Sequence, residues 1–356
     1  MKRLLLALSI AVLVISGCAP QEPTGNDGPK TEAPPTEAHT ATLAQTTAPQ
    51  YFVPLARFPD GRFFGIAGVR MTAWNAETGE TKDLGHAWSG VLSPDGQRIA
   101  FQGEKGLHML EVQSGHIVTV TDGSRQNGSF LNPGLWSPDA KKIVYMYVME
   151  WSSDYFVYNV ETGTSSAYEF KNIPNFLTAP VDWLEDRLLF VVHANKSRTG
   201  EQEYTENGYR SDLMLADTEG NFSPVTRLED GQFVHYCGAT RDNDTFMVLV
   251  REEHGRSFAG LVNPYSEEIK RLPFEDNPVA GSISPNGKFA IFITQPNPRQ
   301  LSVGVFDLQN KKVILEKEIP GYERPLDFIW DDTGHTVYFG MPGENDNGVL
   351  YTVHIN

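Results

Sequence analysis

Residues 90–102 read Gly-Val-Leu-Ser-Pro-Asp-Gly-Gln-Arg-Ile-Ala-Phe-Gln: an apolar segment, a four-residue turn and a β-rich run. Pro, Asp and Gly each favour a tight turn, through a fixed φ, a local side-chain hydrogen bond and a permitted positive φ. The branched and aromatic residues after the turn favour a strand. The stretch therefore predicts two antiparallel strands joined by a tight turn.

The same pattern returns along the chain in seven copies, spaced by about 35 to 57 residues. This is the period of β-propeller blades. The copies are Phe58-Pro59-Asp60-Gly61, Ser93-Pro94-Asp95-Gly96, Ser137-Pro138-Asp139-Ala140 and Ser284-Pro285-Asn286-Gly287, with looser ones at Leu184-Glu185-Asp186, Arg241-Asp242-Asn243-Asp244 and Asp331-Asp332-Thr333-Gly334.

A second turn pattern, which we call the second signature, follows the β-rich run in four of the seven units. It ends in Gly and begins with Asn, Asp or Glu, at residues 75–79, 111–115, 159–163 and 217–220. Such residues close short hairpins. Each unit then contains four strands. The predicted fold is all-β: a β-propeller of seven four-stranded blades, with six or eight blades as alternatives.

These Ser-Pro-Asp-Gly turns and the β-runs after them resemble the TolB-type propeller repeats, which are relatives of the tryptophan–aspartate (WD) repeats. The resemblance covers about residues 51–356. It implies a propeller fold and says little about function, because propellers carry many activities.

The last unit lacks a strand. Its turn at residues 331–334 is followed by strand patterns at 336–340 and 349–355 only. An incomplete ring exposes sheet edges. We therefore expect residues 40–46 to supply the missing outer strand. The alternative is a three-stranded last blade with residues 40–50 disordered.

The N-terminus has the pattern of a bacterial lipoprotein. Lys2 and Arg3 precede an apolar run over residues 4–15, which is too short to span a bilayer. Ile15-Ser16-Gly17-Cys18 then resembles a lipobox. The resemblance implies a signal peptide at 1–17, cleavage before Cys18, diacylglycerol on its thiol and often N-acylation, for example by palmitate. An ordinary signal peptide with a chance cysteine is the alternative.

Residues 18–50 are expected to be a lipidated tether before the propeller domain at 51–356. The stretch is rich in Pro, Thr, Ala, Glu and Gly, so it buries too little surface to fold alone. The expected location is extracytoplasmic, on the cell membrane or on an outer membrane if the organism has one. A short tether would keep the domain, and its loop face, near that membrane.

The net charge and the cysteine content exclude some classes of partner and of covalent crosslink. The net charge of −16 argues against nucleic acid and against adhesion of the folded domain to anionic lipid. Cys18 and Cys237 are the two cysteines. If Cys18 carries lipid, no intrachain disulfide is possible. A buried core role is the favoured interpretation of Cys237, rather than a reactive thiol.

The loops between the second and third strands vary most in length, up to residues 193–212. Variable loops on a rigid scaffold commonly carry binding residues, and aromatic and Arg side chains commonly anchor partners. Solvated loops without a role are the alternative. The candidates are Trp151, Arg198, Tyr204, Tyr209, Arg210, His254, Arg256 and Arg299.

No catalytic residue or cofactor is predicted. There is no Gly-x-Ser-x-Gly elbow or phosphate-binding glycine loop, and no catalytic domain is expected after the last blade. Glu344-Asn345-Asp346-Asn347-Gly348 has alternating oxygen ligands but lacks the distal Glu of an EF-hand, which favours an acidic turn. The alternative is an axial metal site, as in propeller lyases or lactonases. Its candidate ligands are His86, Asp182, His235 and Asp327.

Together these patterns predict an envelope lipoprotein whose propeller binds a protein, peptide or glycan without catalysis. The first alternative is a propeller enzyme with the axial metal site. The second is a structural subunit of an envelope assembly.

Overall fold

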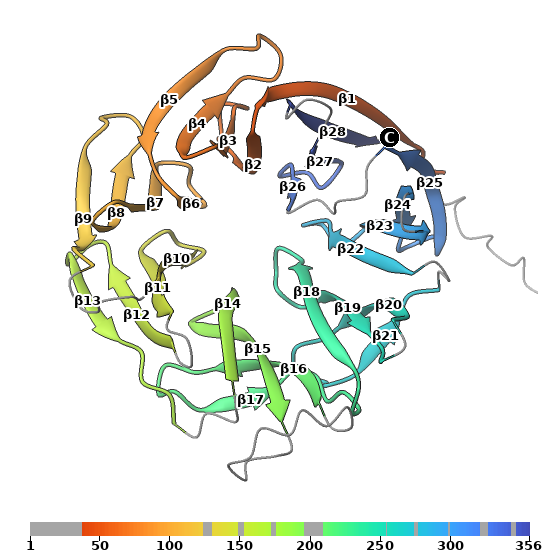
Figure 1. The fold of residues 1–356 in the computed structure, drawn as a ribbon. Coiled ribbons are helices and arrows are strands. Elements are labelled where there is room, and N and C mark those ends of the chain that lie inside the picture. The colour runs from red at the N-terminus through yellow and green to blue at the C-terminus, as the bar shows by residue number, and fades with distance from the viewer. Residues whose placement is uncertain are drawn as a thin grey trace, which may run out of the picture. The chain divides into compact units, whose positions relative to one another are not determined.

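The computed structural model confirms the predicted fold as a ring of seven four-stranded antiparallel blades (Figure 1). It describes residues 38–123, 130–148, 153–171, 176–195, 209–253, 255–273, 277–297, 300–320, 327–342 and 347–356. Within these ranges every regular element is a strand, and there is no helix long and apolar enough to cross a membrane.

The first four blades follow one another along the chain, each from its innermost to its outermost strand. Blade 1 contains β2 (Phe52–Arg57), β3 (Phe63–Ala67), β4 (Arg70–Trp74) and β5 (Thr81–His86). Blade 2 contains β6 (Ser89–Leu92), β7 (Arg98–Gly103), β8 (Gly106–Glu111) and β9 (Ile117–Thr121). Blade 3 contains β10 (Phe130–Trp136), β11 (Lys142–Val148), β12 (Ser153–Asn159) and β13 (Thr164–Ala167). Blade 4 contains β14 (Phe176–Leu184), β15 (Arg187–Asn195), β16 (Tyr209–Ala216) and β17 (Phe222–Pro224).

The remaining blades repeat this order, except that the outermost strand of blade 7 comes from the other end of the chain. Blade 5 contains β18 (Phe233–Ala239), β19 (Phe246–Arg251), β20 (Ser257–Val262) and β21 (Ile269–Arg271). Blade 6 contains β22 (Pro278–Ile283), β23 (Phe289–Asn297), β24 (Gln300–Asp307) and β25 (Lys312–Ile319). Blade 7 contains β26 (Phe328–Trp330), β27 (Thr336–Pro342), β28 (Asn347–Ile355) and β1 (Ala41–Gln50).

All seven predicted turns join the first strand of a blade to its second. In blade 2 the Ser93 Oγ donates to Asp95 Oδ1 (2.5 Å) and accepts from Arg98 N (2.9 Å). Gly96 N donates to the Ser93 carbonyl (2.8 Å), with Gly96 at a φ of +68°. These bonds satisfy the turn's polar groups internally, so it is short and self-contained.

The second signature forms the hairpin between the third and fourth strands. Asn75 Oδ1 accepts from Glu77 N (2.9 Å) and Thr78 N (3.1 Å), as an Asx-type turn does. Two further copies, opening at Asn263 and Asp307, place the non-glycine residues Glu267 and Lys311 at positive φ. The sequence pattern missed both because it required a closing Gly.

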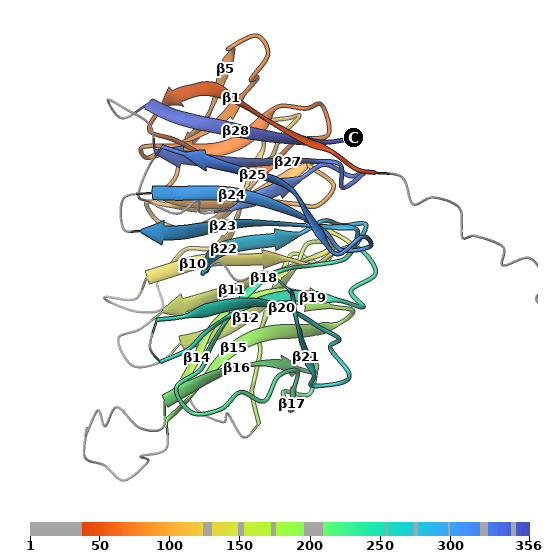
Figure 2. The same cartoon turned by 90° about the vertical axis from the view of Figure 1, so that its right-hand side faces the viewer.

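Strand direction alternates within a blade, so both kinds of turn lie at one end of the blades (Figure 2). We call this end the turn face. The connections between second and third strands and those between blades lie at the opposite end, which we call the loop face. The binding residues predicted from sequence belong to loop-face connections.

The ring closes as predicted. β1 pairs antiparallel with β28, from Ala41 opposite Ile355 to Gln50 opposite Asn347. Thr40 and Asn356 exchange two backbone hydrogen bonds of 3.1 and 2.8 Å. The compact unit begins at His39, so the propeller starts well before residue 51 and includes the last part of the expected tether.

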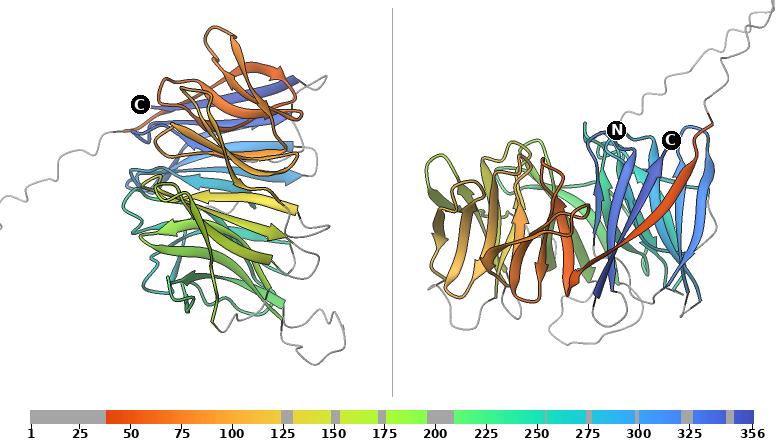
Figure 3. Two further views of the ribbon diagram at one scale, coloured as in Figure 1. Left: turned by 90° about the vertical axis from the view of Figure 1, so that its left-hand side faces the viewer. Right: turned by 90° about the horizontal axis from the view of Figure 1, so that it is seen from above.

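The chain also contacts blade 6 where it enters the propeller. His39 Nδ1 lies 2.8 Å from Asp307 Oδ2, and the His39 ring packs edge-on against Phe289. Burial raises the pKa of Asp307, but hydrogen bonds from Asn310 and His39 outweigh it and leave that pKa below its usual value. The start of β1 and the end of β28 thus lie together at the turn face (Figure 3).

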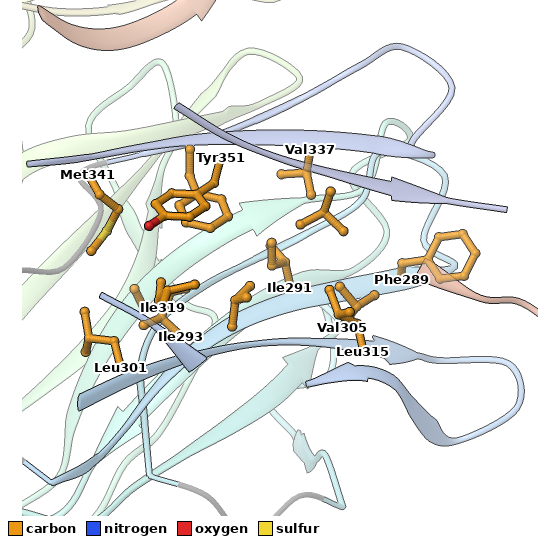
Figure 4. Packing of buried hydrophobic residues seen from close by; sticks show 14 of the residues in the cluster. Phe289, Ile291, Ile293, Leu301, Val305, Leu315, Ile319, Val337, Met341 and Tyr351 are labelled. Atoms are coloured by element: carbon orange, nitrogen blue, oxygen red, sulfur yellow. The ribbon is translucent and has the colours of Figure 1, made fainter. Parts of the chain in front are cut away.

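The core is made of apolar side chains between neighbouring sheets. One cluster joins blades 6 and 7 through residues such as Ile291, Val305, Val337 and Tyr351 (Figure 4). Burial of such side chains contributes roughly 1.5–3 kcal/mol each relative to exposure. Neighbouring blades are therefore held together mainly by apolar packing.

Tryptophans before the turns join neighbouring blades. Trp136 Nε1 donates to the Val91 carbonyl, and Trp330 Nε1 donates to Ser282 Oγ, both at 3.1 Å. The indole nitrogen of Trp183, at the same place in blade 4, is buried without a hydrogen-bond partner in the described part of the chain.

Candidate functional site

Most of the binding residues predicted from sequence lie outside the described residues. These are Trp151, Arg198, Tyr204, His254 and Arg299, and the predicted lipidation residue Cys18 lies outside them as well. Tyr209 opens β16, but its side chain is not among the described ones.

Two predicted binding residues have described side chains. Arg210 is partly exposed on β16, and its Nε lies 3.1 Å from Asp212 Oδ2, so its charge is paired within its own strand. Arg256 is exposed just before β20 on the loop face, where its carbonyl accepts a hydrogen bond of 2.7 Å from Glu252 N. Of these two, Arg256 is the more exposed residue.

The four residues of the axial-metal alternative do not form a metal site. No three His, Cys, Asp or Glu side chains among the described residues are grouped so that they would hold an ion. Asp182 and His235 lie on innermost strands, and Asp327 directly precedes one. His86 instead ends the outermost strand of blade 1, because residues 81–86 pair with β4. The sequence interpretation placed it near the innermost strand of blade 2.

Asp182 takes part in a contact between blades rather than in metal binding. The Tyr236 hydroxyl of blade 5 donates to its Oδ2, and Trp183 N donates to Oδ1 at 2.7 Å. Burial raises the pKa of Asp182 and that of Tyr236. The Asp182 carboxyl therefore holds its proton more tightly than an exposed Asp. Asp327, directly before β26, is exposed.

Cys237 is buried on the innermost strand of blade 5. It packs in a cluster with Met247, Leu249 and Ile283. Burial raises the pKa of its thiol to about 12. The reactive form of cysteine is the thiolate, so Cys237 is inert at neutral pH and serves as a core residue.

An exposed apolar patch lies on the loop face, where blade 1 meets blade 2. Val69 and Trp88 are each 49 % exposed, and His86 beside them is exposed too. The rings of His86 and Trp88 are 6.2 Å apart at 76°. We call these three residues the Trp88 patch. Among the tryptophans that the structure describes, Trp88 alone is exposed.

Sequence reasoning missed the Trp88 patch because it considered only the loops between second and third strands. Trp88 lies in the connection between two blades, and such connections reach the same face. The available signal was a tryptophan outside every strand pattern and away from the turns, where Trp136, Trp183 and Trp330 lie.

The turn face has two hollows between blades. One of about 620 Å³ lies between blades 3 and 4; its lining includes Lys142, Asn159, Tyr168, Lys171, Trp183 and Asp186. Another of about 570 Å³ lies between blades 5 and 6 and includes Arg241 and Asp332, which form an ion pair of 3.8 Å. Their walls mix both signs of charge.

Comparison with known proteins finds matches to this chain in structure but none in sequence. No family model and no curated protein matches its sequence. Oligogalacturonate lyase from Vibrio parahaemolyticus matches in structure with a TM-score of 0.63 at 11 % identity, over 88 % of this chain and 97 % of that one.

Two further propellers are similar. The β-propeller domain of the Trilobed protease from Pyrococcus furiosus has a TM-score of 0.54 at 12 % identity, over 85 % of this chain and 91 % of that one. TolB from Acinetobacter baumannii has a TM-score of 0.45 at 13 % identity, over 87 % of this chain and 79 % of that one. The structures with a TM-score above 0.5 include an enzyme and a protease domain, and likeness at such identities shows the fold alone. The chain is a seven-bladed β-propeller, and the comparisons assign it no activity.

Proposed function

We propose that this chain is an extracytoplasmic lipoprotein, anchored through Cys18, whose propeller binds a protein, peptide or glycan partner on its loop face. The lipobox pattern and the composition of the segment after it support the anchor. The connections between second and third strands on the loop face vary most in length, from two residues between β3 and β4 to thirteen between β15 and β16, and this variation supports the choice of binding face.

One observation carries the proposal: the chain enters the ring at the turn face. Ala41 pairs with Ile355, beside the turn that contains residues 331–334. A lipid anchor that precedes β1 therefore holds the propeller from its turn face. The loop face is left free for a partner.

This geometry leads us to propose an orientation other than the one expected from sequence, with the loop face directed away from the membrane. The 20 residues from Ala19 to Ala38 separate Cys18 from His39. A flexible chain of that length spans on the order of 25 Å. A blade with a nine-residue strand such as β28 is roughly 30 Å tall. The anchored propeller is thus expected to hold its turn face nearer the lipid than its loop face.

The propeller-enzyme alternative has less support. Its main argument is the likeness in fold to a lyase, and fold does not determine activity. No three of its four candidate ligands are grouped in the described structure so that they could hold an ion. A structural subunit of an envelope assembly would also bind its neighbours through the loop face. It differs from our proposal because that contact would be permanent.

Photo-crosslinking in intact cells tests the binding face. We expect a crosslinkable residue at Arg256 or Lys105, both exposed on the loop face, to give discrete partner adducts. The same residue at Gln113, in a turn-face hairpin, should give none because that face is turned toward the anchor. Adducts from Gln113 alone would contradict the proposal.

A further inference from the structure

We infer that the outer edge of β1, over residues 41–47, is a docking site for an extended, uncharged segment of a protein partner, which adds to blade 7 as a fifth strand. This edge lies on the rim of the ring and is separate from the loop face (Figure 1). Three properties of β1 support it: the hydrogen-bonding groups along its free edge, their contrast with the other outermost strands, and the firm attachment of β1 to the propeller.

The free edge of β1 carries a regular row of main-chain hydrogen-bonding groups. Thr40 and Asn356 exchange two backbone hydrogen bonds of 3.1 and 2.8 Å, and bonded and non-bonded residues alternate from there along the antiparallel ladder. Leu43, Gln45 and Thr47 therefore direct their N–H and C=O groups away from β28. Among the residues that the structure describes, β1 pairs with β28 alone. These three residues thus offer a row of donors and acceptors to an incoming strand.

The spacing of these groups identifies the class of the occupant. Alternate residues of an extended strand repeat at about 6.8 Å, and another extended main chain carries its N–H and C=O groups at the same repeat. Strand addition to a sheet edge depends on this match. A saccharide lacks that alternation of N–H and C=O groups, and a lipid acyl chain has no hydrogen-bond donor. An extended polypeptide segment therefore fits the edge.

The other outermost strands are poorer edges. Natural sheets protect their edges with short strands, charged side chains, prolines and bulges. β13 and β17 have four and three residues, and β9 has five with a register shift against β8. β5, β21 and β25 each carry at least one lysine. In contrast, β1 has no charged residue and keeps its register from Ala41 to Thr47, with its one proline, Pro49, beyond that run.

β1 is held firmly at both ends, so its free edge is preorganised. Before the strand, His39 Nδ1 lies 2.8 Å from Asp307 Oδ2. Toward its end, Ala48 is buried between blades 7 and 1. Ala44 and Gln45, between these two points, are exposed. An incoming segment therefore meets a fixed and accessible edge, which lowers the entropic cost of association.

A separate protein is favoured over a second copy of this chain as the occupant. Each copy carries a net charge of −16, and like charge opposes the approach of two such rims. An uncharged segment of another protein meets no such repulsion at β1, because β1 itself has no charged side chain.

Binding to an array of defined peptides tests this docking site. Full-length protein in detergent is titrated with twelve-residue peptides whose central residues are drawn from Val, Ile, Thr, Ala and Gln. Each peptide is also made with N-methyl groups on its odd or on its even central residues. We expect one of these two methylated forms to lose at least about tenfold in affinity and the other to bind, because only one set of N–H groups faces β1.

Proline variants of the protein test the same edge from the other side. Gln45→Pro should weaken peptide binding at least about tenfold, because it removes a donor and places a ring against the added strand. Ile117→Pro is the matched control. Glu111 N donates to the His116 carbonyl, so the alternation turns the N–H of Ile117 away from β8, and a proline there should leave binding unchanged. Circular dichroism checks that both variants keep the fold.

Amide hydrogen exchange in the unaltered protein locates the bound peptide. We expect the peptide to slow exchange at Leu43, Gln45 and Thr47 and to leave Ala44 and Thr46 unchanged, because these two already donate to β28. Slowing only elsewhere, binding that survives Gln45→Pro, or no binding by any peptide of the array would overturn the docking site. Slowing at the same three amides when the protein alone is concentrated would show a second copy as the occupant and overturn the partner class.

Discussion

Ala44→Pro is expected to destabilise the whole propeller by about 3 kcal/mol or more, whereas Gln45→Pro, one residue later, should cost less than about 1 kcal/mol. Hydrogen-bonded and non-bonded pairs alternate in an antiparallel ladder. Thr40 and Asn356 exchange two hydrogen bonds, so the register places Ala44 in a bonded pair and Gln45 in a non-bonded one. Proline at 44 removes a donor to β28 and puts its ring against that strand.

The pair of variants is closely matched because both side chains are exposed on β1 and neither belongs to the core. Gln45 N–H points out of the ring, since β1 is the outermost strand and has no strand on its other side. Urea unfolding followed by tryptophan fluorescence gives the two free energies of unfolding. Equal destabilisation by the two prolines would show that β1 does not close blade 7 in the register described here.

Cys18→Ala is expected to move the protein from the membrane fraction to the soluble extracytoplasmic fraction. Each methylene of an acyl chain contributes about 0.8 kcal/mol to membrane binding, and two or three chains anchor firmly. Loss of the acyl chains removes this contribution, so most of the protein should leave the membrane fraction. Fractionation and incorporation of an alkyne-labelled fatty acid measure both consequences.

The second cysteine provides the control. Cys237 is buried with an inert thiol, so Cys237→Ala should keep both the lipid label and the membrane location, at a modest cost in stability. A Cys18→Ala protein that still carries label, or still sediments with membranes, would refute lipidation at Cys18.

The fold was readable from sequence because its signals are local and repeated. Ser93, Ser137 and Ser284 each set the same turn by the same hydrogen bonds, and each repeat carries strand-forming residues on both sides. Ring closure was predictable for a different reason, since a strand was missing from one end and an unassigned segment remained at the other. Where a turn used Glu267 or Lys311 instead of Gly, the local signal disappeared although the geometry persisted.

The candidate site was less predictable because it depends on contacts between segments. Residues 41–50 have the composition of a tether and become a strand only because β28 offers a partner. The sequence made His86 a candidate axial ligand, but its pairing with β4 places it at the end of the outermost strand of blade 1. Exposure of Trp88 follows from the shortness of the neighbouring β3–β4 hairpin, a feature of another part of the chain.

Energy transfer from labelled propeller to lipid tests most directly whether the anchored protein presents its loop face outward. The full-length protein, with the lipid that we propose on Cys18, is placed in zwitterionic vesicles with an acceptor on the lipid headgroups. A donor is attached to Gln113→Cys or Lys105→Cys, while Cys237 is buried and stays unlabelled. Both positions are exposed on blade 2, at its turn face and loop face respectively. We predict clearly stronger transfer from position 113 than from position 105. Equal transfer, or stronger transfer from position 105, would contradict the proposed orientation and with it the assignment of the loop face to partners away from the membrane.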